Sequence, residues 1–175
     1  MRLLFEIDYK NYKENGTIGK RPSARAIIIK NNKLGMIYNK KYDYYDFPGG
    51  GIDKNESNEE ALIREVKEEV GLEVIKESIK EYGLVIRKED GRIEDLFIQE
   101  NYYYLCDVTN NLLKQNLDDY ELEEGFSLRW VEAKDVIDTN LNHEHYDEDK
   151  IRNLHLMERI IKIINILLDE KLIKM

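Results

Sequence analysis

Three glutamates near the middle of the chain have the spacing of a divalent-cation site. Glu65, Glu68 and Glu69 fall at positions i, i+3 and i+4, so a helix would present all three carboxylates on one face. Carboxylates this close repel each other unless a cation compensates them. Because oxygen-only ligands favour hard ions, the pattern predicts Mg²⁺ or Mn²⁺ as the cofactor.

The helix that must hold these carboxylates can be predicted from its neighbours. Ser57 followed by Glu60 is a capping box, and Gly71 is placed to end the last turn in a left-handed conformation. Arg64 lies one turn from Glu60 and from Glu68 and is expected to pair with both. Apolar residues fall on a second arc of the helix, which should anchor it on a sheet: Leu62, Ile63, Val66 and Val70.

A glycine-rich loop, Phe47-Pro48-Gly49-Gly50-Gly51, precedes this helix. Three glycines let a ligand approach the backbone closely and leave the carbonyl oxygens unobstructed. The loop and the acidic helix together resemble the signature of the Nudix hydrolase family, G-x5-E-x7-R-E-U-x-E-E-x-G-U, in which U is aliphatic. Every specified position is matched: Gly50, Glu56, Arg64, Glu65, Val66, Glu68, Glu69, Gly71 and Leu72.

The resemblance implies a fold and a reaction. The fold is an α/β/α sandwich with a mixed β-sheet between helices, over roughly Arg21 to Lys174. The reaction, as in MutT-like nucleotide pyrophosphohydrolases, is hydrolysis of a pyrophosphate bond in a nucleoside diphosphate linked to another group, X. Divalent ions would neutralise two phosphates and activate a water.

The resemblance also assigns roles to the signature residues. Glu68 and Glu69 are the main metal ligands, and Glu65 is a ligand or the general base. The backbone carbonyl of Gly50 is a further ligand. Arg64 joins the catalytic set as the residue that braces Glu68.

A further ligand in this family comes from a loop shortly before a strand that carries a tryptophan. Here three carboxylates precede Trp130 in such a loop, and the resemblance does not choose among Glu121, Glu123 and Glu124. Glu123 and Glu124 are the expected metal ligands of this loop. Glu100, in a long predicted strand, is a fourth candidate if that strand borders the cleft.

Substrate-binding residues are expected beside the glycine loop. Arg25, and with it Arg21, can fork onto phosphate oxygens, although a surface ion pair is an equal alternative. Gly49 offers backbone to the substrate. Several aromatic residues could stack on a nucleobase, although packing is the commoner role of aromatics next to a hairpin. They are Tyr42, Tyr44, Tyr45 and Phe47, of which Tyr45 and Phe47 are taken as the candidates.

Composition limits the protein class. The 175 residues contain no Pro/Gly/Ser-rich linker, so we expect a single domain over residues 1–175, with an N-terminal strand and loop over 1–20 and a C-terminal helix over 147–174. A net charge of −9 disfavours general nucleic-acid or anionic-membrane binding, and small nucleotides are the expected substrates. The N-terminus is charged too early for a secretory signal and no stretch reaches membrane-span length, so cytoplasm is the expected location.

Other residues invite weaker interpretations. Cys106 is the one cysteine, which excludes a disulfide within the chain and suggests a buried thiol. His143, His145 and His155 are too loosely spaced to favour zinc. The apolar stripe of the last helix favours packing on the sheet over dimerisation, so a monomer or a homodimer is expected.

The remaining elements follow from hydrophobic periodicity. Strands are expected at Met1–Tyr9, Arg25–Lys30, Lys33–Asn39, Tyr82–Arg87, Ile93–Val108 and Phe126–Val131, with a hairpin turn at Asn31-Asn32. Loops are expected at Lys10–Lys20 and Thr109–Gly125, and helices at Ala133–Ile137 and Asp147–Lys174.

The substrate is inferred by elimination. The segment Arg87-Lys88-Glu89-Asp90 lacks the proline of ADP-ribose hydrolases and the tyrosine of dinucleoside polyphosphate hydrolases, and the coenzyme A motif is missing. A nucleoside triphosphate, intact or damaged, cleaved to monophosphate and pyrophosphate is therefore favoured. A nucleotide sugar or an RNA 5′ end is the enzymatic alternative. A non-catalytic nucleotide sensor is disfavoured because no signature carboxylate is missing.

Overall fold

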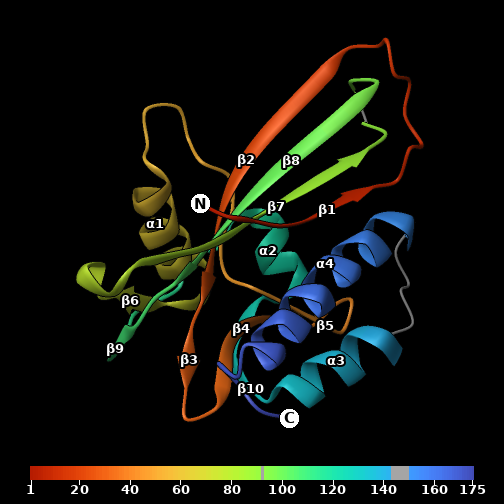
Figure 1. Ribbon diagram of the computed structural model, residues 1–175. Helices are drawn as coiled ribbons and strands as arrows, with labels where there is room; N and C mark the ends of the chain where they lie inside the picture. Colours follow the sequence, from red (N-terminus) through yellow and green to blue (C-terminus); the bar gives the residue numbers. More distant parts are fainter. Residues whose placement is uncertain (92, 143–149) are drawn as a thin grey trace.

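The computed structural model describes residues 1–91, 93–142 and 150–175, and its largest element is a four-stranded mixed sheet (Figure 1). The strands lie in the order β1 (Leu3–Asp8), β7 (Lys80–Glu89), β8 (Leu96–Leu105) and β2 (Ile18–Ile27). The central pair β7–β8 is antiparallel, whereas the outer pairs β1–β7 and β2–β8 are parallel. The predicted mixed sheet is confirmed.

A second sheet continues from the lower end of the first (Figure 1). It contains β10 (Ser127–Val131), β4 (Lys33–Asn39) and β3 (Ile29–Lys30), with β5 (Tyr44–Asp46) paired to β4. The turn between β3 and β4 falls at Asn31 and Asn32, which both have positive φ (52° and 63°) as a type I′ turn requires. A two-stranded ribbon, β6 (Leu72–Val74) and β9 (Val108–Leu112), lies beside α1.

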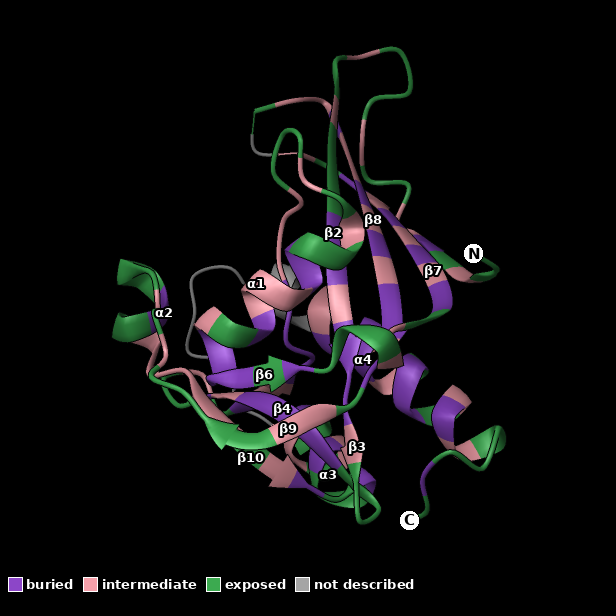
Figure 2. Cartoon of the chain, turned by 90° about the vertical axis from the view of Figure 1, so that its left-hand side faces the viewer, coloured by how far each residue is buried: buried purple, intermediate pink, exposed green. Residues whose placement is uncertain are grey.

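Helices cover both sides of the strands. The helical elements are α1 (Asn58–Val70), η1 (Lys76–Ser78), α2 (Asp119–Glu124), α3 (Ala133–Asn142) and α4 (Lys150–Asp169). One core cluster joins α1 to β2 and β4, and the other joins α4 and α3 to the opposite side of the strands. Buried residues therefore gather where α1 and α4 face the sheets, while the far end of β2 is exposed (Figure 2). This is the α/β/α sandwich that the sequence predicted.

The apolar arc predicted for α1 is confirmed at three of its positions. Leu62, Val66 and Val70 are fully buried, whereas Ile63 is only half-buried. The stripe on α4 packs into the core in the same way, with no exposed surface at Ile160, Ile163, Ile164 and Leu167. Cys106 is buried, as expected of an inert thiol.

Several predicted boundaries are wrong. Residues Ile18–Lys20 belong to β2 rather than to a loop, and this strand accommodates Pro22 because it is the edge strand of its sheet. The segment expected to be a loop before β10 contains most of β9 and all of α2, and the expected short helix at Ala133 extends to Asn142. The expected start of the last helix, at residues 147–149, lies outside the described residues, as do His143 and His145. Among the helices that the structure describes, none combines the length and apolarity needed to cross a membrane.

Candidate active site

The predicted ends of α1 are confirmed by their hydrogen bonds. The Ser57 hydroxyl accepts from the Glu60 backbone N–H at 3.2 Å, and the Glu60 carboxylate accepts from the Ser57 N–H at 2.9 Å. Gly71 ends the helix at φ 65° and ψ 24°. Because both ends are fixed by local contacts, the orientation of the acidic face is determined within the signature itself.

The glycine loop is hydrogen-bonded to the free edge of β2. The backbone N–H of Ala24 donates to the Gly50 carbonyl at 3.0 Å, and the N–H of Ala26 donates to the Pro48 carbonyl at 2.8 Å. Gly49 has a φ of 137°, and a Cβ there would lie 2.0 Å from the Ala24 carbonyl oxygen, so only glycine fits. The Gly50 carbonyl, an expected metal ligand, keeps one lone pair for a second partner.

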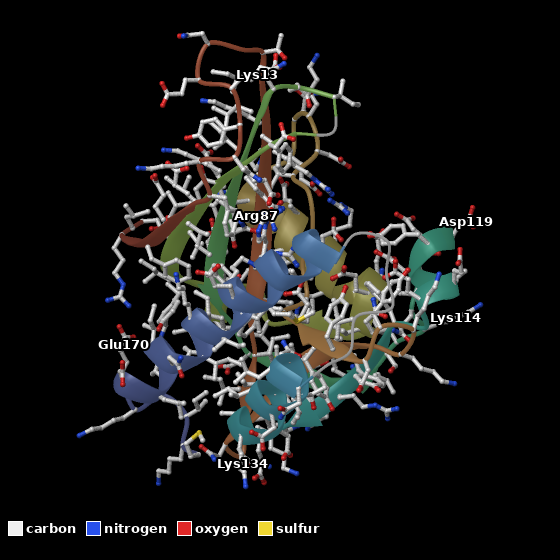
Figure 3. All side chains as sticks on the ribbon, turned by 90° about the vertical axis from the view of Figure 1, so that its right-hand side faces the viewer. Lys13, Arg87, Lys114, Asp119, Lys134 and Glu170 are labelled. Atoms are coloured by element: carbon white, nitrogen blue, oxygen red, sulfur yellow. The ribbon has the colours of Figure 1, made fainter. Side chains whose placement is uncertain are left out.

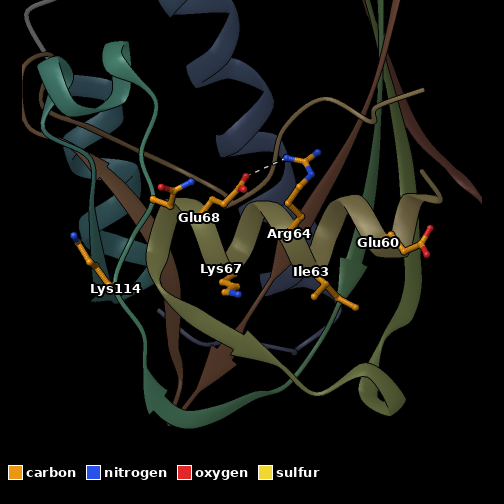
Figure 4. Close-up of a pocket in the computed structure, with 7 residues that line it drawn as sticks. Glu60, Ile63, Arg64, Lys67, Glu68 and Lys114 are labelled. Atoms are coloured by element: carbon orange, nitrogen blue, oxygen red, sulfur yellow. Dashed lines mark hydrogen bonds and ion pairs between the residues drawn. The ribbon is translucent and has the colours of Figure 1, made fainter. Parts of the chain in front are cut away.

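Arg64 connects the loop to the helix. Its Nε and Nη2 donate to the two oxygens of Glu56 at 2.8 and 3.0 Å, and Nη2 also donates to the Gly51 carbonyl at 3.0 Å. Its Nη1 reaches Glu65 at 2.8 Å and Glu68 at 3.2 Å, the latter drawn as a dashed line in Figure 4. Hydrogen bonding to Glu56 is the main cause of its raised pKa, although partial burial opposes this.

One expected contact of Arg64 is wrong. Glu60 was predicted to pair with it, but the Glu60 carboxylate is used by Ser57 in the capping box. Glu56, the signature residue in the loop ahead of the helix, takes that place. Glu68 and Arg64 also line a shallow groove on the outer side of α1, with Lys67 (Figure 4).

The three glutamates differ in burial. The Glu68 side chain is 34% exposed, that of Glu65 is 13% exposed, and Glu69 as a residue is 5% exposed. Burial raises the pKa of Glu65, although its contact with Arg64 opposes the shift. Burial raises the pKa of Glu69 well above its ordinary value, and the nearby Arg25 and the Gly49 N–H, 2.6 Å from Oε2, only partly offset it.

Glu65 and Glu69 face a cavity of about 360 Å³ that is bounded by the glycine loop, α1, α2, the large sheet and α4. Glu121 adds a third carboxylate, and its charge together with that of Glu65 raises the pKa of Glu69 further. Hard oxygen donors that repel one another in this way fit a divalent cation chemically. In the present arrangement of the described side chains, however, no three such donors lie close enough to hold one ion.

The carboxylates ahead of Trp130 separate into different environments. Glu121 is 5% exposed, lines the cavity, and accepts from the Asp118 N–H and the Tyr120 hydroxyl, each at 2.8 Å. Glu124 also lines the cavity and accepts from the Asn39 amide at 2.6 Å.

Three of the expected or candidate ligands are not part of the cavity lining: Glu68, which lines the groove on the outer side of α1, Glu123 and Glu100. Glu123 points away from it and forms a surface ion pair with Lys41, with its side chain 72% exposed. Glu100 accepts from the Tyr102 hydroxyl at 3.0 Å and is also outside the cavity lining. The structure therefore does not bring Glu123 to the cavity, and Glu121 and Glu124 line it instead. The reason is the short helix α2, on which Glu121 and Glu124 lie three residues apart and share a face, whereas Glu123 lies on another.

The expected aromatic platforms are also corrected. Phe47 is fully buried with its ring edge-on to Tyr103, at a centroid distance of 5.7 Å, so it belongs to the core. Tyr45 packs against Tyr38 and exchanges hydrogen bonds with Asn140 of α3, outside the cavity lining. The aromatic residues that line the cavity are Tyr42, Tyr44, Tyr120 and Phe126.

The expected phosphate-binding arginines do line the cavity. Arg25 is held by Asp46 at 3.1 Å and by the Phe47 carbonyl at 3.1 Å, while Arg21 is exposed. Gly49 lines the cavity as well. The sequence analysis missed four lining residues that come from β7, β8 and α4: Arg87, Gln99, Leu156 and Arg159. No local pattern marks them, because they meet only through strand pairing and helix packing.

Of the three histidines considered for a zinc site, His155 lies among the described residues. His155 stacks on Tyr9, at a centroid distance of 3.4 Å, and its Nδ1 lies 2.6 Å from a Glu89 oxygen. This contact joins the N-terminal segment and α4 to the strand β7. The described partners of His155 are thus an aromatic ring and one carboxylate.

A model of the NUDIX domain matches residues 19–153 of the chain. The chain belongs to the Nudix family. It is therefore a hydrolase that acts on acid anhydrides, with pyrophosphohydrolase activity on nucleotide derivatives. Nudix hydrolases generally use divalent metals, which agrees with the oxygen donors of α1.

Two relatives of this Nudix protein carry different enzyme names. An RNA pyrophosphohydrolase of Hydrogenovibrio crunogenus is 32% identical over 130 residues, which cover 65% of this chain and 74% of that protein. An 8-oxo-dGTP diphosphatase of Buchnera aphidicola is 37% identical over 94 residues, 45% of this chain and 70% of that protein. A MutT protein of Bacillus halodurans has a similar fold, with a TM-score of 0.55 at 17% identity over 78% of this chain and 82% of that chain.

Proposed function

We propose that the chain is a divalent-metal-dependent pyrophosphohydrolase whose substrate carries a nucleoside 5′-triphosphate, cleaved to a monophosphate and pyrophosphate. The observation that carries this proposal is the cavity in which signature carboxylates of α1 face arginines of the large sheet. Carboxylates suit Mg²⁺ or Mn²⁺, and arginines suit phosphoryl oxygens.

The residues of the chain have separate tasks in this reaction. Glu65, Glu68 and Glu69 would hold the cation, which supplies neutralisation of phosphate charge and activation of a water. Burial raises the pKa of Glu65, which makes this carboxylate a stronger base than an exposed one for the proton of the attacking water. Arg64 keeps Glu65 and Glu68 together, and Arg25 balances negative charge on the phosphoryl group.

A free nucleoside triphosphate is the first candidate substrate. The net charge of −9 gives the protein no general attraction for a polyanionic strand. The cavity volume of about 360 Å³ is in the range of small-molecule sites. The similarity to an 8-oxo-dGTP diphosphatase supports a free and damaged nucleotide.

An RNA 5′ end is the second candidate. The similarity to the RNA pyrophosphohydrolase covers more of this chain than the similarity to the 8-oxo-dGTP diphosphatase does. The groove on the outer side of α1 contains Lys67 and Lys114, two cations that could contact a strand leaving the site (Figure 4).

A substrate panel tests the proposed function. With Mg²⁺ present, pyrophosphate and monophosphate release would be measured for the common nucleoside triphosphates, 8-oxo-dGTP, a 5′-triphosphate RNA oligonucleotide and a nucleotide sugar. We expect kcat/KM for a free triphosphate to exceed that for RNA by at least about tenfold, a difference of about 1.4 kcal/mol in transition-state stabilisation. The reverse order supports the RNA candidate. Preference for the nucleotide sugar overturns the triphosphate assignment, and inactivity on every anhydride overturns the enzymatic one.

Magnesium is expected to stabilise the folded protein. A ligand that binds only the folded state adds about 2.7 kcal/mol at 100 times its dissociation constant. For a chain of this length each kcal/mol raises Tm by about 2–4 °C, so saturating Mg²⁺ should raise Tm by roughly 5–10 °C. The measurement is a thermal melt in EDTA against millimolar MgCl₂, with NaCl matched for ionic strength. An unchanged Tm would argue against a cation site that the folded chain provides.

A further inference from the structure

Part of the cavity is lined by guanidinium groups from elements far apart in the sequence. Arg25 comes from β2, Arg87 from β7 and Arg159 from α4, whereas the catalytic carboxylates come from α1. Arg87 lies on the large sheet beside α4 (Figure 3). The cavity is therefore lined by acidic groups of α1 and by basic groups of the large sheet and α4.

Strand register explains how these arginines meet. Arg87 of β7 pairs with Gln99 of β8, which pairs with Arg21 of β2. Asn101 follows Gln99 by two residues on β8. Tyr103 follows Gln99 by four residues and pairs with Arg25 of β2. Because side chains alternate along a strand, this set occupies one face of the sheet.

The three arginines differ in their ion pairs: Arg87 contacts Glu89 at 3.0 Å, whereas Arg25 and Arg159 share one carboxylate. Asp46 receives Arg25 Nη1 at 3.1 Å, and its two oxygens receive Arg159 Nη2 at 3.0 and 3.1 Å. Among the residues that the structure describes, Asp46 is the only carboxylate in ion-pair contact with either arginine. Arg159 is only 1% exposed. Two buried guanidinium groups that share one ion-pair partner favour a bound anion, although Glu69 and Glu65 also lie near Arg25.

Hydrogen-bond donors in this region also lack acceptors. Among the described residues that line the cavity, the buried Nε atoms of Arg25 and Arg159 have no hydrogen-bond partner. Nδ2 of Asn101 and the hydroxyl of Tyr103 are likewise without a partner, on the same face of the sheet but outside the cavity lining. Buried donors are normally satisfied, and a phosphate offers only acceptor oxygens. The part of the cavity lined by these arginines is thus complementary to a phosphate, which offers negative charge and acceptor oxygens.

We propose, on the basis of the proposed function, that Arg25, Arg87 and Arg159 form a subsite for the terminal phosphate of the substrate. The group X is then itself a phosphoryl group. The triphosphate enters the cavity with its terminal phosphate beneath α4, and the nucleoside stays at the outer rim beside Tyr42 and Tyr120. Tyr120 is 55% exposed, which leaves this rim accessible.

This orientation has a consequence for substrate choice. A nucleoside at the rim keeps its 3′ side outside the cavity, so free triphosphates and RNA 5′ ends can both enter phosphate first. A nucleotide sugar has an uncharged X and leaves the charge of the arginine subsite uncompensated. The subsite therefore selects against it.

Binding of inorganic pyrophosphate to the metal-free protein tests the subsite. Isothermal titration in EDTA removes any contribution from a cation at the carboxylates. We expect saturable binding to the wild type and at least about tenfold weaker binding to Arg159→Lys, because lysine keeps the charge but loses the planar fork. The matched control is Arg129→Lys, an exposed arginine over the Tyr38 ring and outside the cavity, which should bind as the wild type does.

The outcomes are decisive in both directions. Wild-type protein that does not bind pyrophosphate in EDTA, or a folded Arg159→Lys that binds it equally well, overturns the subsite. Preferential binding of guanosine over pyrophosphate would assign the arginine-lined part to a nucleobase and also overturn it. If Arg159→Lys does not fold, Arg87→Lys is used, for which we expect about threefold weaker binding, and unchanged binding counts against the proposal. Pyrophosphate binding without any hydrolysis refutes the proposed function alone, whereas hydrolysis without pyrophosphate binding refutes the subsite alone.

Discussion

Replacing Glu68 with glutamine is expected to lower kcat by at least about 100-fold while the protein remains folded. Loss of a residue that merely supports a metal ligand costs about 10–100-fold, and a ligand itself should cost more. Glu68 belongs to neither core cluster, and its one side-chain ion pair among the described residues is with Arg64. The free energy of unfolding should therefore change little. Initial rates on the best substrate and a thermal melt in EDTA would measure the two quantities.

The matched control for this variant is Glu59→Gln. It makes the same chemical change on the same helix, at an exposed position outside the cavity. We expect kcat within about twofold of wild type and a slight loss of stability, because Glu59 lies in the first turn where negative charge favours the helix. Equal activity of Glu68→Gln and Glu59→Gln at saturating substrate and Mg²⁺ would remove Glu68 from the catalytic set.

The part of the site predicted correctly from the sequence is the part made by local contacts. The start and end of α1 depend on Ser57, Glu60 and Gly71, all within the signature. The position of the glycine loop follows from Gly49, which must adopt a positive φ against β2. Residues within a few positions of one another along the chain determine this geometry, so the sequence pattern specifies it.

The part that was missed depends on tertiary contacts. Arg87 and Arg159 are 72 residues apart, and only the packing of α4 on β7 brings them to one cavity. Phe47 was a reasonable base platform by sequence position, but the turn into the glycine loop directs it into the core. Hydrophobic periodicity indicates that a residue is buried without indicating which neighbours it will have.

The sequence contains signals that separate Glu123 from Glu121 and Glu124. Asp118 and Glu121 form a capping box and Gly125 adopts the left-handed conformation that ends α2. These are the same signals that predicted α1. Recognising the helix would have separated Glu123 from the other two, since successive residues on a helix point in different directions.

Replacing Glu69 with glutamine is expected to abolish turnover and to stabilise the metal-free protein above neutral pH. Burial raises the pKa of Glu69 in the folded state above its unfolded value. The folded state then binds the proton more tightly, so wild-type stability is complete below the unfolded pKa, about 4.3, and falls as pH rises toward the folded pKa. Glutamine does not ionise, and its amide oxygen can still accept from the Gly49 N–H.

The stability gain should depend on pH and on the cation. Each unit by which the folded pKa is raised corresponds to about 1.4 kcal/mol, so Tm of Glu69→Gln in EDTA should exceed that of wild type at pH 8. At pH 4 the two should be equal, since the wild-type carboxyl is then protonated. Added Mg²⁺ should reverse the order at pH 8, because only the wild type keeps all its ligands. A less stable Glu69→Gln at pH 8 in EDTA would mean that Arg25 already compensates the Glu69 charge, and the cavity would then have no carboxylate that depends on a cation.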